Sequence, residues 1–92
     1  MIISFKHKGL KRYYLKGDKS KLSPEMIIRI QLILSVLDVV TCIEDLNDSS
    51  FKTHALIGER LGQVSITVRA NWRIVFRIEN ENIYDVDFVD YH

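Results

Sequence analysis

Three segments in the second half of the chain alternate apolar and polar residues, and this alternation constrains the fold more than any other feature. The apolar positions are Val64, Ile66 and Val68, then Trp72, Ile74, Phe76 and Ile78, and finally Tyr84, Val86 and Phe88. A period of two is typical of strands that bury one side. Only "RAN" and "ENEN" separate the segments, and such short links join antiparallel neighbours. The sequence therefore predicts an antiparallel sheet with one apolar face.

Pairing the apolar residues across this sheet predicts its register, because a shift of one residue would turn them to solvent. The expected pairs are Val68 with Trp72, Ile66 with Ile74, Phe76 with Val86, and Ile74 with Phe88. The same register sets Asp85 opposite Arg77. We expect these two residues to form a structural salt bridge that stabilises the last hairpin.

The other face of the predicted sheet collects polar residues near the chain end. The register places Thr67 beside Arg73 and Arg73 beside Val89, and Tyr91 follows two residues later on the same side. We therefore expect Arg73 and Tyr91 to be near neighbours on the face that the helices do not cover.

The first half of the chain is predicted to be mainly helical. Residues 7–16 carry lysines on one side and Leu10 with two tyrosines on the other, and Gly17 is a typical helix end. Residues 2–5 are apolar enough for a short strand. Residues 41–50 indicate a loop with room for one helical turn.

A long helix should start at Ser23, a good N-cap, with Pro24 in the first helical position. One stripe at helical spacing predicts core residues: Met26, Ile30, Ile33, Leu37 and Val40. A second stripe lies on another side of the same helix: Ile28, Leu32, Val36 and Val39. Either the first helix covers the second stripe, or a partner protein does. The helix is too short and too charged to span a membrane.

Chain length and composition fit one small domain, residues 1–92. The expected fold class is α+β, with two N-terminal helices packed on one face of a mostly antiparallel sheet. The single cysteine, Cys42, cannot form an internal disulfide, which favours a reducing compartment. At the N-terminus a short apolar stretch precedes the charges, the reverse of a signal peptide, so we expect a cytoplasmic protein.

The cations are concentrated near the N-terminus although the formal net charge is only +1. Seven of them lie between residues 6 and 21, and Asp18 is the single acid there. Among them, Lys8, Lys11 and Arg12 are candidate contacts to a phosphate backbone. The alternative is solvated charge on a helix surface.

Several kinds of chemistry have no matching pattern in the sequence. The histidines and Cys42 lack the spacing of metal ligands, and no glycine-rich phosphate loop is present, so no metal and no cofactor are expected. A group of cations and proton carriers remains: His54, Arg60, Arg73, Tyr91 and His92. Such side chains could cleave RNA without a metal, because RNA supplies its own 2′-hydroxyl nucleophile.

The chain resembles the HigB family of toxins, within the RelE-like superfamily, over essentially its whole length. The resemblance is carried by "MIISFKHKGLKRYY", "LILSVLD", "HALIGERLGQVSITV" and "NWRIVFR" followed by "YDVDFVDYH". It implies a RelE-like microbial RNase fold and a cytoplasmic toxin of a type II toxin–antitoxin pair. Such toxins cut messenger RNA on the translating 70S ribosome, need no metal, and leave a cyclic phosphate.

The resemblance also implies the partners. A HigA-like helix-turn-helix antitoxin would neutralise the toxin, and the pair would repress its own operon. The toxin would reach operator DNA only through that antitoxin, and no membrane is involved. The second apolar stripe of the long helix is the candidate antitoxin-binding surface.

Roles carry over to five positions by resemblance. His54 is an acid–base candidate, and Arg73 would hold the scissile phosphate. Tyr91 would position the RNA or donate a proton to it. His92 would act as an acid–base or orienting group, and Asp90 would orient the neighbouring side chains.

One departure from the family pattern concerns the segment "HALIGERLG", where the family usually has "HPLKGDRKG". Ile57 and Leu61 replace two lysines. Arg60 or Lys52 could substitute in binding RNA phosphate, the site could work weakly, or the chain could be a catalytically dead module that binds antitoxin or ribosome. These interpretations stay open at the level of sequence.

Overall fold

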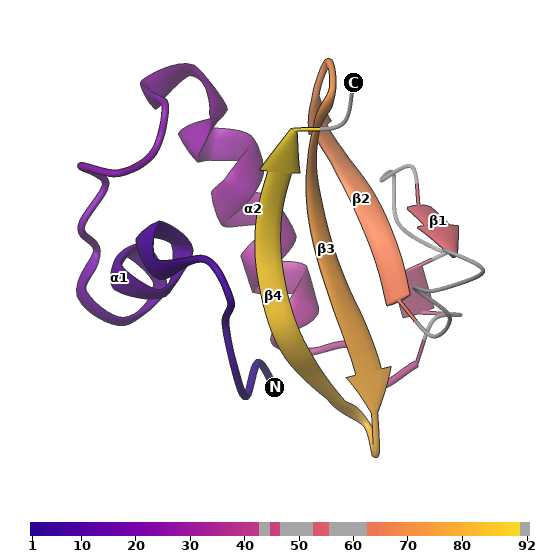
Figure 1. The fold of residues 1–92 in the computed structure, drawn as a ribbon. Coiled ribbons are helices and arrows are strands. Elements are labelled where there is room, and N and C mark those ends of the chain that lie inside the picture. Colours follow the sequence, from indigo (N-terminus) through magenta and orange to yellow (C-terminus); the bar gives the residue numbers. More distant parts are fainter. Residues whose placement is uncertain (43–44, 47–52, 56–62, 91–92) are drawn as a thin grey trace.

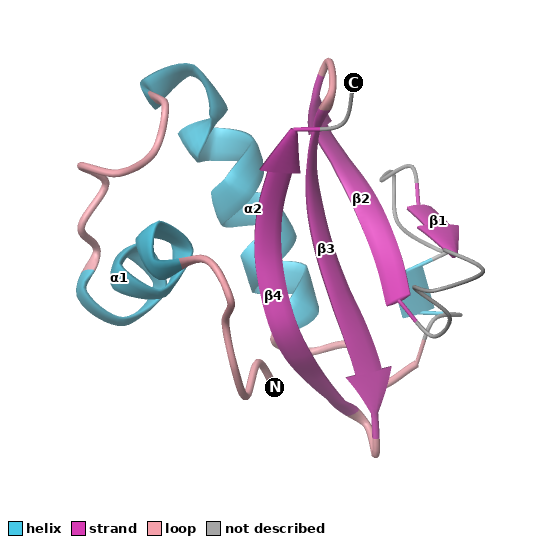
Figure 2. Cartoon of the chain, viewed as in Figure 1, coloured by secondary structure: helices cyan, strands magenta, loops and turns pink. Residues whose placement is uncertain are grey.

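The computed structural model describes residues 1–42, 45–46, 53–55 and 63–90. The helices are α1 (Lys8–Lys16), the 3-10 turn η1 (Pro24–Met26) and α2 (Ile27–Leu37), and the strands are β1 (Thr53–Ala55), β2 (Gln63–Arg69), β3 (Trp72–Glu79) and β4 (Asn82–Asp90). The strands form one antiparallel sheet in the order β1-β2-β3-β4 (Figure 1). Figure 2 separates this sheet from the helices by colour. The predicted α+β fold class is confirmed.

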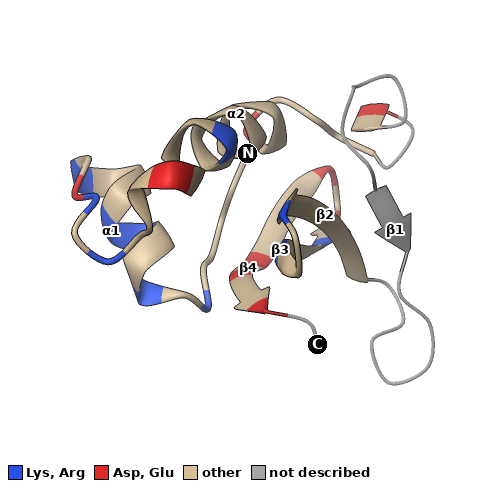
Figure 3. Ribbon diagram, turned by 90° about the horizontal axis from the view of Figure 1, so that it is seen from above, with Lys and Arg blue, Asp and Glu red and all other residues tan. Residues whose placement is uncertain are grey.

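The two helices share one core with the sheet but lie at different places on it. In Figure 3, α2 lies over one face while α1 lies beside β4, the edge strand. Leu10 of α1 is fully buried in the same cluster as Ile74 and Phe76 of β3. The five residues of the predicted core stripe on the long helix are all buried: Met26, Ile30, Ile33, Leu37 and Val40. Within the described residues, no helix is long and apolar enough to cross a membrane.

The ends of α1 follow from its flanking residues. The His7 imidazole caps the helix, because its Nδ1 accepts the backbone N–H of Leu10 at 3.1 Å. Gly17 ends the helix at φ 70°, a left-handed conformation that glycine adopts without steric cost. The predicted boundary at Gly17 is confirmed.

The long helix starts differently from the prediction. Pro24 opens a 3-10 turn, and the α-helix proper begins only at Ile27. The Ser23 hydroxyl donates to the Glu25 carboxylate at 3.3 Å and caps no backbone N–H among the described residues. A proline fixes φ for the first turn, so the chain can enter the helix without a serine cap.

The second apolar stripe of α2 faces solvent in this chain. Ile28 and Val39 are each 75% exposed and Leu32 is 52% exposed, whereas Val36 is half-buried. The expectation that the first helix covers this stripe is therefore wrong. The reason is that α1 packs along the neighbouring side of α2, next to Leu34 and Asp38, instead of over the stripe.

The predicted register is confirmed in the middle of the sheet and wrong near two bulges. Ile66 pairs with Ile74, and Ile74 pairs with Phe88. Arg69, instead of the expected Val68, lies opposite Trp72, because the register shifts between Thr67 and Arg69. An extra residue on one strand is the ordinary form of a β-bulge and cannot be seen in an alternating pattern.

A second bulge lies in β4 at Asp85, which has φ 57°. Arg77 consequently pairs with Tyr84 and not with Asp85, and Phe76 faces Asp85 and Val86 together instead of Val86 alone. The predicted salt bridge is still present, since Arg77 Nε lies 3.1 Å from the Asp85 carboxylate. The bulge thus moves the backbone pairing by one residue while the side chains still meet.

Residues 2–5 lie beside β4 in parallel, but only as isolated bridges at Ile2 and Phe5 and not as the continuous strand expected. Their position is fixed by Asp38 at the end of α2. One carboxylate oxygen accepts the Tyr14 hydroxyl at 2.6 Å and the backbone N–H of Ile2 at 3.2 Å. Asp38 therefore connects the N-terminal segment, α1 and α2.

The Tyr14 bond should make stability depend on pH at the alkaline end. Donation to the Asp38 carboxylate raises the pKa of Tyr14 from 10.0 to about 12. The folded state favours the neutral phenol, so the contribution is complete below pH 10 and is lost as the pH rises toward about 12. We expect Tyr14→Phe to lower the free energy of unfolding by about 1.5 kcal/mol near neutral pH. Urea unfolding across this range, with Tyr13→Phe as control, should show the difference vanish at the alkaline end.

Candidate functional site

Arg73 is the predicted catalytic residue whose side chain the structure defines best. It lies on β3 opposite Thr67 of β2 and Val89 of β4, as predicted. Its Nη1 donates to the Thr67 hydroxyl oxygen at 2.6 Å, and both side chains are half-buried. Residues that face one another across an antiparallel pair share a side of the sheet, so this group lies away from α2.

This bond holds the guanidinium in one orientation. Arginine offers planar, bidentate hydrogen bonding that matches the oxygens of a phosphate. Because one guanidinium nitrogen is already bonded to the neighbouring strand, the side chain loses less conformational entropy when a ligand binds. Arg73 is therefore suited to hold a phosphodiester against this face.

The face that carries Arg73 is closed at its centre. Ser65 and Val75, which share the face by alternation, are 1% and 3% exposed. The face is half-exposed towards its ends, at Thr67 and Arg73 on one side and at Gln63 and Arg77 on the other. In β1, His54 is paired with Ser65 in the backbone register, and the His54 side chain lies outside the described residues.

An aromatic stack supports the Arg73 end of the sheet from the core side. Trp72 stacks on Phe88 with ring centroids 4.7 Å apart. The His7 ring lies edge-on to Phe88 at a centroid distance of 5.7 Å. Trp72 is also the register partner of Asp90, the last residue of β4. By alternation, Asp90 shares the side of Trp72 and not that of Arg73, and it is exposed. This stack fixes the backbone on both sides of Arg73.

The remaining predicted site residues cannot be placed. Lys52, Arg60, Tyr91 and His92 lie outside the described residues, as does Ile57. The expected proximity of Arg73 to Tyr91 therefore stays a prediction. So does the gathering of His54 and His92 around one phosphate.

The structure does bring two of the predicted phosphate-binding cations together. Lys8 and Arg12 line a cleft of about 540 Å³ at the start of α1, whereas Lys11 is exposed and does not line it. Lys6 and Lys21 complete the cleft, together with His7, Gly9 and Asp87. Four cations lie in this cleft with Asp87, and one of them, Arg12, is ion-paired with Asp18 at 3.1 Å, so the cleft keeps an excess of positive charge that favours anions. In Figure 3 the Lys and Arg residues collect around α1, across the molecule from β1.

This basic cleft depends on close packing at Gly9. A Cβ there would lie 2.8 Å from the Lys21 Cβ and 2.9 Å from the His7 ring. Asp87 connects the cleft to the sheet, since it pairs with Val75 and shares the face of Arg73. The basic cleft therefore reaches the β4 edge next to the face that carries Arg73.

Thr67 lies beside Arg73, as the predicted register requires, and its hydroxyl bond to the guanidinium makes it a candidate positioning residue. We expect Thr67→Val, which keeps the shape but removes the acceptor, to slow RNA cleavage by about tenfold, because one hydrogen bond to a charged group is lost. Thr67→Ser keeps the hydroxyl and should restore most of the rate. The measurement is single-turnover cleavage, with circular dichroism of each variant to exclude misfolding. Equal rates for the valine and serine variants would show that the bond to Arg73 is irrelevant.

Comparison with known proteins gives a family match and a likeness of fold. Residues 3–92 match the family described as "RelE-like toxin of type II toxin-antitoxin system HigB". The chain is 47% identical over 92 residues to a Proteus vulgaris protein named "Endoribonuclease HigB", covering 100% of both. It also superposes on a chain of "The structure of YoeB dimer from Staphylococcus aureus" with a TM-score of 0.62 and 18% identity, covering 100% of this chain and 97% of that one. The last likeness shows the fold alone.

Proposed function

The chain belongs to the HigB-like toxins of type II toxin–antitoxin systems, and we propose that it is an endoribonuclease that cuts messenger RNA on the translating ribosome. The observation that carries the proposal is Arg73, held by Thr67 at 2.6 Å on the side of the sheet away from α2. A guanidinium held in this way suits a phosphodiester substrate.

The reaction uses a nucleophile that belongs to the substrate. The 2′-hydroxyl of one nucleotide attacks the neighbouring phosphorus, and the bond to the 5′-oxygen of the next nucleotide breaks. One proton leaves the 2′-hydroxyl and one reaches the departing oxygen, so the upstream fragment ends in a cyclic phosphate. Charge builds up on the phosphate oxygens, and Arg73 donates hydrogen bonds to them most strongly at that moment.

The proton transfers are assigned to residues near the chain end and on β1. His54, Tyr91 and His92 exchange protons with the 2′-hydroxyl and the leaving oxygen, and Asp90 orients its neighbours. Imidazole suits this task because it can donate and accept a proton near working pH, and a neutral phenol can donate one. The reaction class needs no metal. These roles rest on the family resemblance.

The basic cleft is proposed as a second contact to RNA phosphates. Lys8 and Arg12 line it, and Lys11 adds charge on the exposed side of α1. Lys52 and Arg60 are proposed to contact phosphate near the catalytic group. Such contacts release counterions and make affinity fall steeply with salt.

Charge reversal in the basic cleft tests this second contact. We expect Lys8→Glu to weaken binding to ribosomes carrying message by about tenfold at low salt and to reduce the salt slope by about one. Lys16→Glu, on the same helix but outside the cleft, is the matched control and should change affinity little. If the two variants behave alike, the effect belongs to net charge and not to the cleft.

The proposed partners follow from family membership. The antitoxin is expected to be a HigA-like helix-turn-helix protein that neutralises the toxin in the cytoplasm and represses the shared operon with it. The exposed stripe of Ile28, Leu32 and Val39, with half-buried Val36 beside it, is the proposed antitoxin-binding surface. Operator DNA is contacted through the antitoxin alone.

A second candidate function is favoured by Ile57 and Leu61, which replace two family lysines. A chain that lacks these charges could bind antitoxin or ribosome without cutting. Restoring one charge with Ile57→Lys should then raise cleavage by up to about a hundredfold, or about 3 kcal/mol in the barrier. An unchanged rate would show that Ile57 is not what limits the reaction.

Induction in a host that lacks the antitoxin separates the two functions. The endoribonuclease is expected to stop growth and to leave new message ends within translated regions. A binding module that represses only its operon would leave growth and transcripts intact, and that result would contradict the proposal. Arrest of growth with intact transcripts would indicate ribosome binding without cleavage.

A further inference from the structure

Thr67 lies where the regular pairing of the sheet ends on both flanks of β2. In the part of the chain that the structure describes, pairing with β1 goes only as far as Thr53 opposite Ile66. On the other flank, the register with β3 shifts between Thr67 and Arg69. Strand pairing therefore fixes the backbone of Thr67 less firmly than that of Ile66. Its hydroxyl nevertheless accepts the Arg73 guanidinium at 2.6 Å, so the position of Thr67 decides where that guanidinium is held.

Two arginine contacts join the start of the long helix to β2 at this point. Figure 1 shows the start of α2 at the same end of the molecule as the turn between β2 and β3. Arg29 Nη2 donates to the Thr67 carbonyl oxygen at 3.5 Å, in a part-buried position. Arg69 pairs with Glu25 of η1 at 2.8 Å, and these two side chains are 60% and 63% exposed. An ion pair as exposed as this contributes little, so Arg29 is the contact that matters for the strand.

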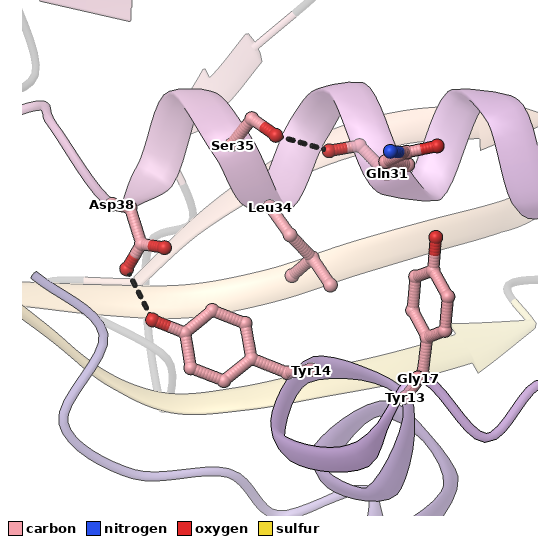
Figure 4. Close-up of a pocket in the computed structure, with 7 residues that line it drawn as sticks. All are labelled: Tyr13, Tyr14, Gly17, Gln31, Leu34, Ser35 and Asp38. Carbon is pink, nitrogen blue, oxygen red and sulfur yellow. Dashed lines mark hydrogen bonds between the residues drawn. The ribbon is translucent and has the colours of Figure 1, made fainter.

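The helix that carries Arg29 is a firm support. Ile30, the next residue, is fully buried in the core, as is Leu37 near the other end of α2. Beyond that end, Asp38 accepts the Tyr14 hydroxyl at 2.6 Å (Figure 4). The helix cannot shift without disturbing these contacts, so Arg29 acts on Thr67 from a fixed position.

The two bonds of Thr67 belong to different groups of one residue. Arg29 bonds its backbone carbonyl, and Arg73 bonds its side-chain hydroxyl. Carbonyl and hydroxyl are joined by a few covalent bonds, so a displacement of the backbone carries the hydroxyl with it. A misplacement of about 1 Å at a catalytic group can cost about a hundredfold in rate. Arg29 is thus connected to Arg73 through one intervening residue.

We propose that Arg29 is a positioning residue for RNA cleavage, because it holds the Thr67 carbonyl while the Thr67 hydroxyl holds the Arg73 guanidinium. This inference rests on the proposed function for the reaction itself. It adds a helix residue to a site that is otherwise built from strands. Arg29 acts through Thr67 and not on the RNA, so its loss should slow the cleavage step and leave ribosome binding unchanged.

The first test is single-turnover cleavage of ribosome-bound message. Arg29→Gln should slow it by about fivefold, less than Thr67→Val, because the bond at 3.5 Å is long. Arg29→Lys should restore most of the rate, since a carbonyl oxygen needs only one donor and an ammonium group can supply it. The matched control is Arg69→Gln, which removes an arginine from the same end of β2 but leaves the Thr67 contact intact. Its rate should stay within about twofold of the wild type.

A double variant tests the route through Thr67. In the Thr67→Val background the bond to Arg73 is already lost, so adding Arg29→Gln should slow cleavage no further. An equal loss in both backgrounds overturns the inference, as does an unchanged rate of Arg29→Gln or a failure of Arg29→Lys to restore it. A loss seen in ribosome affinity and its salt dependence would make Arg29 a phosphate contact, which also overturns the inference.

A second measurement does not depend on cleavage. The Nε–H signal of Arg73 in the ¹⁵N NMR spectrum of the free chain should move in Arg29→Gln toward its position in Thr67→Val, and stay in place in Arg69→Gln. An unmoved signal overturns the inference. If the wild-type chain does not cut message, the ribonuclease proposal fails alone, and this signal still decides the present one. Circular dichroism checks each variant, and Arg29→Met, which keeps the apolar stem, serves in both tests if Arg29→Gln does not fold.

Discussion

Arg73→Ala is expected to lower the rate of message cleavage by about a hundred- to a thousandfold, the usual loss when one donor to a developing oxyanion is removed. The fall should appear in single-turnover rates, because Arg73 acts most strongly in the transition state and less on bound message. Binding to ribosomes should change much less, since the basic cleft around Lys8 and Arg12 is intact.

Two controls make the Arg73 result specific. Arg73→Lys keeps the charge but loses the fork of N–H groups that reaches both Thr67 and a phosphate, so it should recover only part of the rate. Urea unfolding of Arg73→Ala should give a transition close to that of the wild type, because the side chain is only half-buried. A variant that is fully active and folded would remove Arg73 from the mechanism.

Phe76→Ala should have the largest effect on stability, about 3–5 kcal/mol in the free energy of unfolding. Phe76 is fully buried and is the largest of the fully buried side chains in the part of the chain that the structure describes. It also lies at the β4 bulge, where it faces Asp85 and Val86, so its loss would leave a cavity at an irregular point of the sheet. A small domain has only about 5–15 kcal/mol in total, so partial unfolding at physiological temperature is expected.

Urea unfolding monitored by Trp72 fluorescence measures this loss directly. Leu32→Ala is the matched control, because Leu32 is 52% exposed and should cost less than about 0.5 kcal/mol. Similar losses for the two variants would mean that the core does not lie where the structure places it.

The sheet was predictable because alternation records which side of a strand is buried. That pattern gave the pairs of Ile66 with Ile74 and Ile74 with Phe88. The bulges at Val68 and Asp85 were not predictable, since an inserted residue does not change the polarity of its neighbours. β1 was missed because Thr53–Ala55 is only three residues long, too short to show a period.

Helix packing was predictable on one side of α2 and not on the other. Burial of Ile33 and Leu37 follows from helical spacing alone. Whether α1 covers Ile28 and Leu32 depends on the side of α2 against which it packs, and the Tyr14 bond to Asp38 joins α1 to the neighbouring side. Apolar residues exposed on a helix look the same in sequence as buried ones.

The candidate site was predictable in part. Register arguments placed Arg73 beside Thr67, but a hydrogen bond between their side chains could not be deduced from composition. The basic cleft illustrates the same limit. The clustered lysines were evident from the sequence. That Lys8 and Arg12 line the cleft while Lys11 does not depends on how α1 is rotated about its axis.

The most direct test of the proposed function compares one synthetic message, free and bound to programmed ribosomes, after addition of the purified chain. We predict cuts in the bound message only, each leaving a cyclic phosphate, and no cut where the attacking 2′-hydroxyl is replaced by hydrogen. Intact bound message, or cleavage that persists at the deoxy position, would contradict the account.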